Sequence, residues 1–264
     1  MDLGLKGKVA IVLAASKGIG RASALELARE GASVVIGSRD QEALTRTAQE
    51  IEAVSKSRVL PVPTDVTRLE DIRNIVATTV RELGRLDIVV NNAGGPKPGT
   101  FEMLDEEQWV AAFELNLLST VRLVREVVPH LRKAGEGRII NIVSTSVKQP
   151  IDGLVLSNAV RSGVVGLAKT LSVELAEDNI TVNNVCPGRI LTDRVRQVYR
   201  IEERISAGMS EEEALASVAR DIPMKRLGDP AEMGAMVTFL ASRQAAYITG
   251  TTIQVDGGLV RALL

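Results

Sequence analysis

Two closely spaced glycines follow a short apolar run near the N-terminus and provide a candidate binding site. Residues Leu13–Gly20 have the sequence LAASKGIG after the β-branched run Val9–Leu13, and Gly18 and Gly20 begin a helix-like segment. Glycines at such a turn let the backbone approach a pyrophosphate, and the following helix N-terminus attracts its charge. A plain strand-to-helix turn can carry the same glycines, but a turn on the first strand–helix unit favours a dinucleotide site.

The end of the next predicted strand, Ser33–Ile36, should determine which dinucleotide binds, because Ser38 and Arg39 follow it. An Asp there would hold the ribose 2′-hydroxyl of NAD, whereas an Arg accommodates the 2′-phosphate of NADP. Lys17 in the glycine loop can add a second positive charge, and Asp40 is expected to cap the next helix. Arg39 and Lys17 could also be ordinary surface charges. We predict NADP(H) in preference to NAD(H).

Short apolar runs and long amphipathic segments alternate along the whole chain. Strands are predicted at 9–13, 33–36, 58–62, 86–90, 138–143, 180–185 and 251–255, and helices at 19–29, 41–54, 69–83, 106–132 and 154–177. This alternation predicts an α/β fold, a Rossmann-type doubly wound parallel sheet of seven strands in the order 3-2-1-4-5-6-7. Pro61 argues for an edge position of the third strand, and Pro129 should end or kink the long helix.

Residues 189–229 differ from this alternation because they are charged and only weakly periodic. They lie between the sixth predicted strand and a late helix. A long insertion at such a point commonly forms a lid or a binding segment. We therefore expect a single domain over residues 1–264, with a lid-like substrate segment at about 189–229.

The bulk composition argues against several kinds of function. The formal net charge is −1 and aromatic residues make up 2%, so nucleic-acid binding is not expected. No apolar run approaches membrane-spanning length, and the segment MDLGLKGKVA is too charged for a signal peptide. No cluster has metal-ligand spacing, and the single Cys186 suits a reducing compartment. We predict a cytoplasmic protein without metal, membrane or nucleic-acid partners.

Further motifs follow in order, and together they resemble the short-chain dehydrogenase/reductase family over essentially the whole chain. They are Asp65-Val66, the intact Asn91–Gly94 motif NNAG, Pro187-Gly188 with Thr192, and ITGTTIQVDGG from Ile248. The resemblance aligns the glycine loop with the family's TGxxxGxG, with Leu13 and Ala14 replacing Thr and the first Gly. It implies that the cofactor is bound by Ala14, Ser16, Lys17, Gly18, Ile19, Gly20, Ser38, Arg39, Asp65, Val66, Asn92, Ala93, Gly94, Arg161, Pro187, Gly188 and Thr192.

The resemblance also implies a catalytic set of Asn, Ser, Tyr and Lys. Asn116 in FELNLLS and Ser144 in GRIINIVSTS match the first two, whereas Ser157 and Arg161 occupy the Tyr and Lys positions. An aliphatic hydroxyl is a much weaker acid than a phenol, whose pKa is near 10. Arg stays protonated at working pH, so it cannot relay protons as Lys might.

Three replacements for the missing proton donor are conceivable. Ser157 could hold a water molecule that donates, Tyr199 could move in on the lid, or Lys148 could act as the acid. Ser157 and Arg161 could equally be divergent helix residues without a catalytic role.

The resulting prediction is an NADP(H)-dependent oxidoreductase acting on a carbonyl or alcohol. Among relatives the loops look most like 3-oxoacyl-carrier-protein reductases, which makes a 3-oxoacyl thioester one candidate substrate. The alternative is a non-catalytic dinucleotide-binding sensor or partner subunit. The family commonly pairs its two long helices, so we expect a homotetramer, with close approach allowed by Ala111, Ala112, Ser162, Gly163 and Gly166. Packing within one chain is the other explanation for these small residues.

Overall fold

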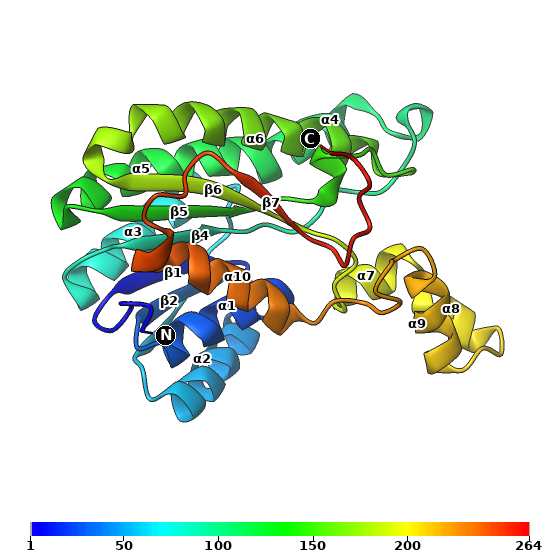
Figure 1. Ribbon diagram of the computed structural model, residues 1–264, viewed down its shortest axis with the longest axis horizontal. Helices are drawn as coiled ribbons and strands as arrows, with labels where there is room; N and C mark the ends of the chain where they lie inside the picture. The colour runs from blue at the N-terminus through cyan, green and yellow to red at the C-terminus, as the bar shows by residue number, and fades with distance from the viewer. Residues whose placement is uncertain (1, 264) are drawn as a thin grey trace.

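Seven parallel strands form the centre of the computed structural model, which describes residues 2–263 (Figure 1). Their order is β3-β2-β1-β4-β5-β6-β7, as predicted. Pro61 lies in the edge strand β3, where a missing N–H costs least. The strands are β1 (Val9–Leu13), β2 (Ser33–Ser38), β3 (Val59–Pro63), β4 (Ile88–Asn91), β5 (Gly137–Ile142), β6 (Ile180–Pro187) and β7 (Thr252–Val255).

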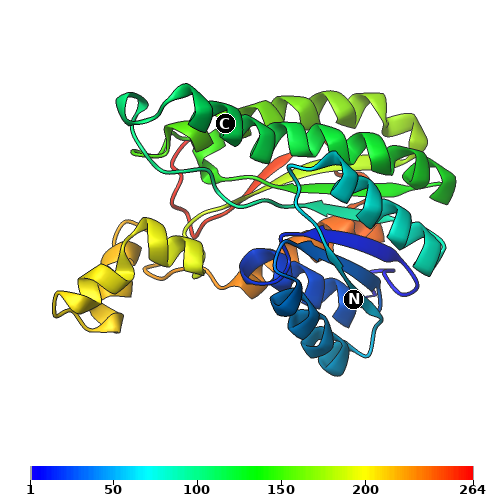
Figure 2. The ribbon, with the colours of Figure 1, turned by 180° about the vertical axis from the view of Figure 1, so that it is seen from behind.

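Helices cover both faces of the sheet (Figures 1 and 2). One face carries α1 (Gly18–Arg29), α2 (Gln41–Ser55) and α10 (Pro230–Ala241). The other carries α3 (Leu69–Leu83), α5 (Ser119–Ala134) and α6 (Val155–Glu174). This arrangement confirms the Rossmann-type doubly wound fold.

Strand β1 illustrates why its sequence is apolar throughout. Successive side chains of a strand point to opposite faces. Ala10 and Val12 therefore pack into the core beneath α1 and α10, whereas Ile11 and Leu13 pack into the core beneath α3 and α5. All five residues of the strand are buried, as expected of a sheet covered on both sides.

The long helix predicted at 106–132 is interrupted in the structure. It consists of α4 (Glu106–Phe113), a π-helical turn at Glu114–Leu118, and α5. Of the two outcomes predicted at Pro129, an end of the helix does not occur, because α5 continues past it to Ala134. The apolar side of α5, which includes Leu123, Val127 and Leu131, is buried in the core, and this burial outweighs one missing backbone hydrogen bond.

The segment at 189–229, whose sequence is only weakly periodic, contains three short helices. Figure 1 shows α7 (Asp193–Val198), α8 (Ile201–Ser206) and α9 (Glu211–Ala219), in yellow and orange, set to one side of the sheet. A small core of its own, around Ile201, Ala214 and Val218, explains why this charged sequence folds. The base of the segment is closed by a 2.8 Å hydrogen bond from the Leu191 N–H to the Gly228 carbonyl.

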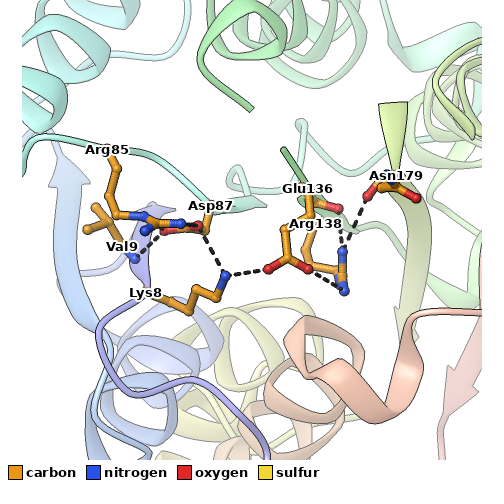
Figure 3. A network of polar contacts seen from close by, with 8 residues as sticks. Lys8, Val9, Arg85, Asp87, Glu136, Arg138 and Asn179 are labelled. Atoms are coloured by element: carbon orange, nitrogen blue, oxygen red, sulfur yellow. Dashed lines mark hydrogen bonds and ion pairs between the residues drawn. The ribbon is translucent and has the colours of Figure 1, made fainter. Parts of the chain in front are cut away.

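A charged network joins the amino ends of the strands (Figure 3). Asp87, which precedes β4, accepts hydrogen bonds from the Val9 N–H at 2.9 Å and from the Arg85 guanidinium. Lys8 joins Asp87 to Glu136, which in turn pairs with Arg138 at 3.4 Å. The hydrogen bond from Lys8 holds the pKa of the Glu136 carboxyl below its ordinary value. The network therefore ties β1, β4 and β5 together at the end of the sheet opposite their carboxyl ends.

Within residues 2–263, no helix has both the length and the apolar character needed to cross a lipid bilayer.

Candidate active site

A large cavity lies at the carboxyl ends of the strands, where parallel sheets of this kind bind ligands. Its volume is about 2150 Å³. The predicted site residues that line it are Ala14, Ser16, Lys17, Gly18, Ile19, Ser38, Arg39, Asp65, Val66, Asn92, Ala93, Gly94, Ser144, Ser157, Arg161, Pro187, Gly188 and Thr192. Gly20 and Asn116 are not part of this lining. Residues from distant parts of the chain thus converge at one place.

The glycine loop turns sharply between β1 and α1. Gly18 has a φ of +57°, a left-handed conformation that favours glycine. A Cβ atom on Gly20 would lie 2.3 Å from the carbonyl oxygen of Ala14, so only glycine fits there. Ala14 has a left-handed φ of +48°, which is unusual for a residue with a side chain.

The N-terminus of α1 is free to bind an anion. Its N-cap residue, Lys17, makes no side-chain capping hydrogen bond, and the first turn of the helix carries no acidic residue. The first N–H groups of a helix need partners from outside the helix. The glycine loop therefore fits a dinucleotide pyrophosphate, in spite of the methyl group of Ala14.

Arg39 and Lys17 have different surroundings. Arg39 is exposed at the end of β2 and makes no hydrogen bond or ion pair with residues 2–263. Lys17 forms a 2.6 Å ion pair with Asp193 at the start of α7. Asp40 caps α2 by accepting a 3.0 Å hydrogen bond from the Ala43 N–H, as predicted. Of these two cations, Arg39 is therefore the one without an ion-pair partner among residues 2–263.

Asp65 lies at the same end of the cavity, after β3. Its carboxylate accepts hydrogen bonds from the Thr67 N–H at 2.9 Å and from the Thr67 hydroxyl at 2.7 Å. Partial burial raises its pKa, but these hydrogen bonds and the charge of Arg39 outweigh burial, and the pKa is below the ordinary value. Asp65 is therefore ionised and can accept a hydrogen bond from a ligand.

Asn116 lies in the π-helical turn between α4 and α5. Its amide donates a 3.0 Å hydrogen bond to the Gly94 carbonyl, while its Oδ1 atom is buried without a partner among residues 2–263. A second cavity of about 10 Å³ is lined by Asn116, Thr120 and Arg161, among others. That volume and its polar lining suit one water molecule.

Three serine hydroxyls lie together where β5 ends. The Ser144 Oγ accepts a 3.1 Å hydrogen bond from the Ser146 N–H. The Ser146 and Ser157 hydroxyls share a 3.1 Å hydrogen bond. Sequence reasoning missed Ser146; the signal was the second serine of the STS triplet at the strand end.

Arg161 follows Ser157 by one turn of α6 and is buried. Its guanidinium donates to the carbonyls of Ile142 at 3.1 Å and Gly94 at 3.3 Å, and so joins the ends of β5 and β4. Burial, together with the positive charge of Arg194, lowers the pKa of Arg161 to about 10. The group therefore remains a cation at neutral pH.

Two of the suggested replacement acids are placed less favourably. Tyr199 lines the cavity, but its hydroxyl accepts a 2.8 Å hydrogen bond from Arg189, whose guanidinium lies 4.9 Å from the ring centroid. Lys148 is not part of the cavity lining. Neither residue makes a hydrogen bond to Ser157, whose hydroxyl is bonded to Ser146.

Cys186 is fully buried at the end of β6, and burial raises the pKa of its thiol to about 12. It is therefore a protonated thiol at neutral pH rather than a nucleophile. No group of three or more His, Cys, Asp or Glu side chains in the described part of the chain is arranged to hold a metal ion.

Comparison with known proteins agrees with this geometry. Residues 13–260 match a family described as enoyl-(acyl carrier protein) reductase. A 3-oxoacyl-[acyl-carrier-protein] reductase of Thermotoga maritima is 35% identical over 97% of this chain and 99% of its own length. The NADPH-dependent reductase BacG of Bacillus subtilis is 33% identical, with 97% and 99% of the two chains covered.

A solved structure extends the likeness to the whole fold. L-sorbose reductase from Gluconobacter frateurii, complexed with NADPH and L-sorbose, superposes with a TM-score of 0.95 at 35% sequence identity, and all of both chains is covered. Another relative, 37% identical over 97% of this chain and 95% of its own, is a short chain dehydrogenase/reductase of Aspergillus oryzae. This chain therefore belongs to the short-chain dehydrogenase/reductase family.

Proposed function

We propose that this protein is an NADP(H)-dependent oxidoreductase that interconverts a carbonyl and an alcohol, with Ser157 and Arg161 in place of the family's Tyr and Lys. One observation carries the proposal: a single cavity of about 2150 Å³ extends from Arg39 to Ser144 and Ser157. The NADPH-dependent relative and the L-sorbose reductase complex support the cofactor and the class of reaction. A 3-oxoacyl thioester is one candidate substrate, by analogy with the Thermotoga relative.

The cofactor would be held by the glycine loop and α1 at its pyrophosphate and by Arg39 at its 2′-phosphate. Asp65 would accept from the adenine, and Asn92, Gly188 and Thr192 would border the nicotinamide half. When bound, the nicotinamide supplies or accepts the hydride. The chain's own residues then have to position the substrate, stabilise the negative charge that develops on its carbonyl oxygen, and supply a proton to that oxygen.

Ser144 and Arg161 are suited to stabilise that oxygen as it becomes negative. The Ser144 Oγ accepts from the Ser146 N–H, which leaves its own proton free to be donated toward the cavity. Arg161 adds a buried positive charge next to the same strand ends. Fixed donors and charges in such a site stabilise a developing oxyanion strongly.

The proton itself has a weaker source. Ser157 is the hydroxyl at the position of the usual acid, and it is hydrogen-bonded to Ser146 at 3.1 Å. General acid catalysis is commonly worth about 10²- to 10⁴-fold. We therefore propose turnover that is slower than in relatives with a phenol at this position.

The test is to measure NADPH oxidation against a panel of aldehydes and ketones, alongside NADPH binding by fluorescence. We expect turnover with at least one carbonyl, and loss of turnover without loss of NADPH binding in Ser144→Ala. If NADPH binds and no carbonyl is reduced, the protein is a dinucleotide-binding sensor or partner subunit.

Cofactor choice gives a separate prediction. Arg39→Asp should reverse the preference, so that NADH binds more tightly than NADPH, because it replaces attraction for the 2′-phosphate with repulsion. Calorimetric titration of both cofactors checks this. Arg46→Asp is the matched control, since Arg46 is exposed on α2 and is not part of the cavity lining. Equal affinities of the wild type for NADPH and NADH would contradict the role of Arg39.

Assembly gives another prediction. Of the five small residues on the long helices, Ala112 is buried and Gly163 lies against Leu117 of the same chain, whereas Ala111, Ser162 and Gly166 are exposed. Val110 and Phe113 on α4 are also exposed, at 53% and 46%. We propose a homotetramer formed through these helices. Light scattering should give the mass of four 28.3 kDa chains.

Val110→Lys should dissociate this assembly, because it would bury a charge in the contact. Val54→Lys, at a position on α2 that is 59% exposed, should leave the assembly intact. A monomeric wild type at micromolar concentration would contradict the proposal.

A further inference from the structure

Arg161 and Arg194 both line the cavity, and sequence reasoning singled out only Arg161. Arg161 comes from α6 and Arg194 from the first turn of α7. The Arg194 Nη2 atom donates a 2.7 Å hydrogen bond to the Pro96 carbonyl, just beyond the NNAG motif. A Cβ atom on Gly95 would lie 2.8 Å from the same nitrogen, so the guanidinium rests directly against the backbone there.

Neither guanidinium is paired with a carboxylate of residues 2–263. Arg161 donates to four backbone carbonyls, those of Ile142, Val143, Ala93 and Gly94. Arg194 reaches one carbonyl and, at 3.4 Å, the Gln197 side chain. Carbonyls supply hydrogen-bond acceptors but no net negative charge. The two positive charges are therefore not neutralised.

The lack of a carboxylate partner distinguishes Arg161 from the other buried arginine of the chain. Arg138 is also almost fully buried, and it forms an ion pair with Glu136 at 3.4 Å. Arg189, which also lines the cavity, has a carboxylate partner in Asp221 at 3.5 Å. Burying a cation without a counter-charge costs free energy, so such groups are normally paired.

The acidic side chains of the cavity lining do not supply the missing charge. Asp193 is exposed and forms its ion pair with Lys17. Asp152 is exposed in the loop before α6. Burial lowers the pKa of the Arg194 guanidinium, and the charge of Arg194 lowers that of Arg161. A bound anion would raise both pKa values again, because it stabilises the charged form of each guanidinium.

We propose that the substrate is a small oxo acid, whose carboxylate binds Arg194 while its carbonyl lies at Ser144 and Ser157. Arg194 is the direct ligand, because its Nε atom has no partner among residues 2–263 and Nη1 has only the long contact to Gln197. Arg161, committed to carbonyls, adds positive potential. A guanidinium presents paired donors that match a carboxylate. This inference rests on the proposed function, which it narrows to anionic carbonyl compounds.

The experiment compares matched pairs of probes, 2-oxo and 3-oxo acids of four to nine carbons and their methyl esters, in NADPH-dependent reduction. We expect kcat/KM for the best acid to exceed that of its ester at least ten-fold. Arg194→Met should raise the KM of the acid about ten-fold or more and leave that of the ester and the Kd of NADPH unchanged. Arg194→Lys should recover part of the loss. Arg200→Met, an exposed arginine of the same segment paired with Glu203, is the control and should change none of these values.

Several outcomes would overturn the inference. Equal kcat/KM for acid and ester would do so while leaving the oxidoreductase function intact. A weaker NADPH affinity in Arg194→Met, with the acid preference unchanged, would assign Arg194 to a cofactor phosphate instead. Reduction of the aldehydes or ketones of the earlier panel, but of no oxo acid, would also overturn the inference. If none of these compounds is reduced, the proposed function fails. Calorimetric binding of an oxo acid to the NADPH-loaded wild type, absent in Arg194→Met, would then still support the anion site, and no binding would refute it.

Discussion

Replacing Ser157 with Tyr and Arg161 with Lys in one protein is expected to raise carbonyl reduction about ten-fold or more. The double change puts a tunable phenol where the structure has an aliphatic hydroxyl, next to an amine in place of the guanidinium. Ser144, Asn116 and the cofactor cavity remain as they are. A ten-fold gain corresponds to about 1.4 kcal/mol of transition-state stabilisation, measured as kcat/KM for NADPH-dependent reduction.

The structure explains why the gain should stay below the full value of a general acid. Ser157 is buried and hydrogen-bonded to Ser146, so the space that its side chain fills is too small for a ring. A tyrosine ring at this position must therefore turn into the cavity. Arg161→Lys also removes the guanidinium, whose hydrogen bonds to the Ile142 and Gly94 carbonyls join the ends of β5 and β4. We expect the double variant to be less stable, with a lower Tm, even as it becomes faster.

Three control variants separate the chemistry from these structural costs. Ser157→Phe adds the ring without its hydroxyl and should give no gain. Ser157→Tyr alone places the phenol beside a cation that does not release its proton, and Arg161→Lys alone provides the amine without a phenol. If the wild type is fast and the double variant inactive, Ser157 and Arg161 form a working alternative site, and the idea of a merely missing acid is wrong.

The fold could be predicted almost completely because its signals are local and repeated. Each strand is a short apolar run, as in β1, and most core helices have one apolar side, so periodicity located the seven strands and the core helices other than α10, which was expected only as a late helix without bounds. The helix boundaries that were predicted wrongly depend on contacts between residues far apart in the sequence. The π-helical turn at Asn116 inserts an extra residue where its side chain meets the Gly94 carbonyl, and no local pattern predicts that.

The site was predictable where the chemistry needs one residue type at one spacing. Gly18, Gly20 and Arg39 follow strand ends, so their positions in the fold could be predicted directly from the sequence. Arg194 could not be found this way, because it lies in a segment where 16 of the 41 residues at 189–229 are basic or acidic. Only the folded path of α7, which brings it against Pro96, distinguishes it from its neighbours.

Gly20→Ala is expected to abolish tight NADPH binding and to destabilise the fold by about 1–3 kcal/mol, near the upper end of that range for overpacking. The added methyl group would lie 2.3 Å from the Ala14 carbonyl oxygen and 2.9 Å from the Ala15 Cα. Both are backbone atoms, so no side chain can rotate away. The loop must open, and the N-terminus of α1 then moves away from the pyrophosphate position.

Gly234→Ala is the matched control for this change. A methyl group there would lie 2.8 Å from the Ala22 carbonyl oxygen, where α10 packs on α1, but Gly234 is not part of the cavity lining. Thermal unfolding should show both variants destabilised. NADPH titration below the Tm should show binding weakened at least ten-fold only in Gly20→Ala. An unchanged NADPH affinity in a folded Gly20→Ala protein would mean that the glycine loop is only a structural turn. Dinucleotide binding would then not depend on a close approach of the cofactor to the N-terminus of α1.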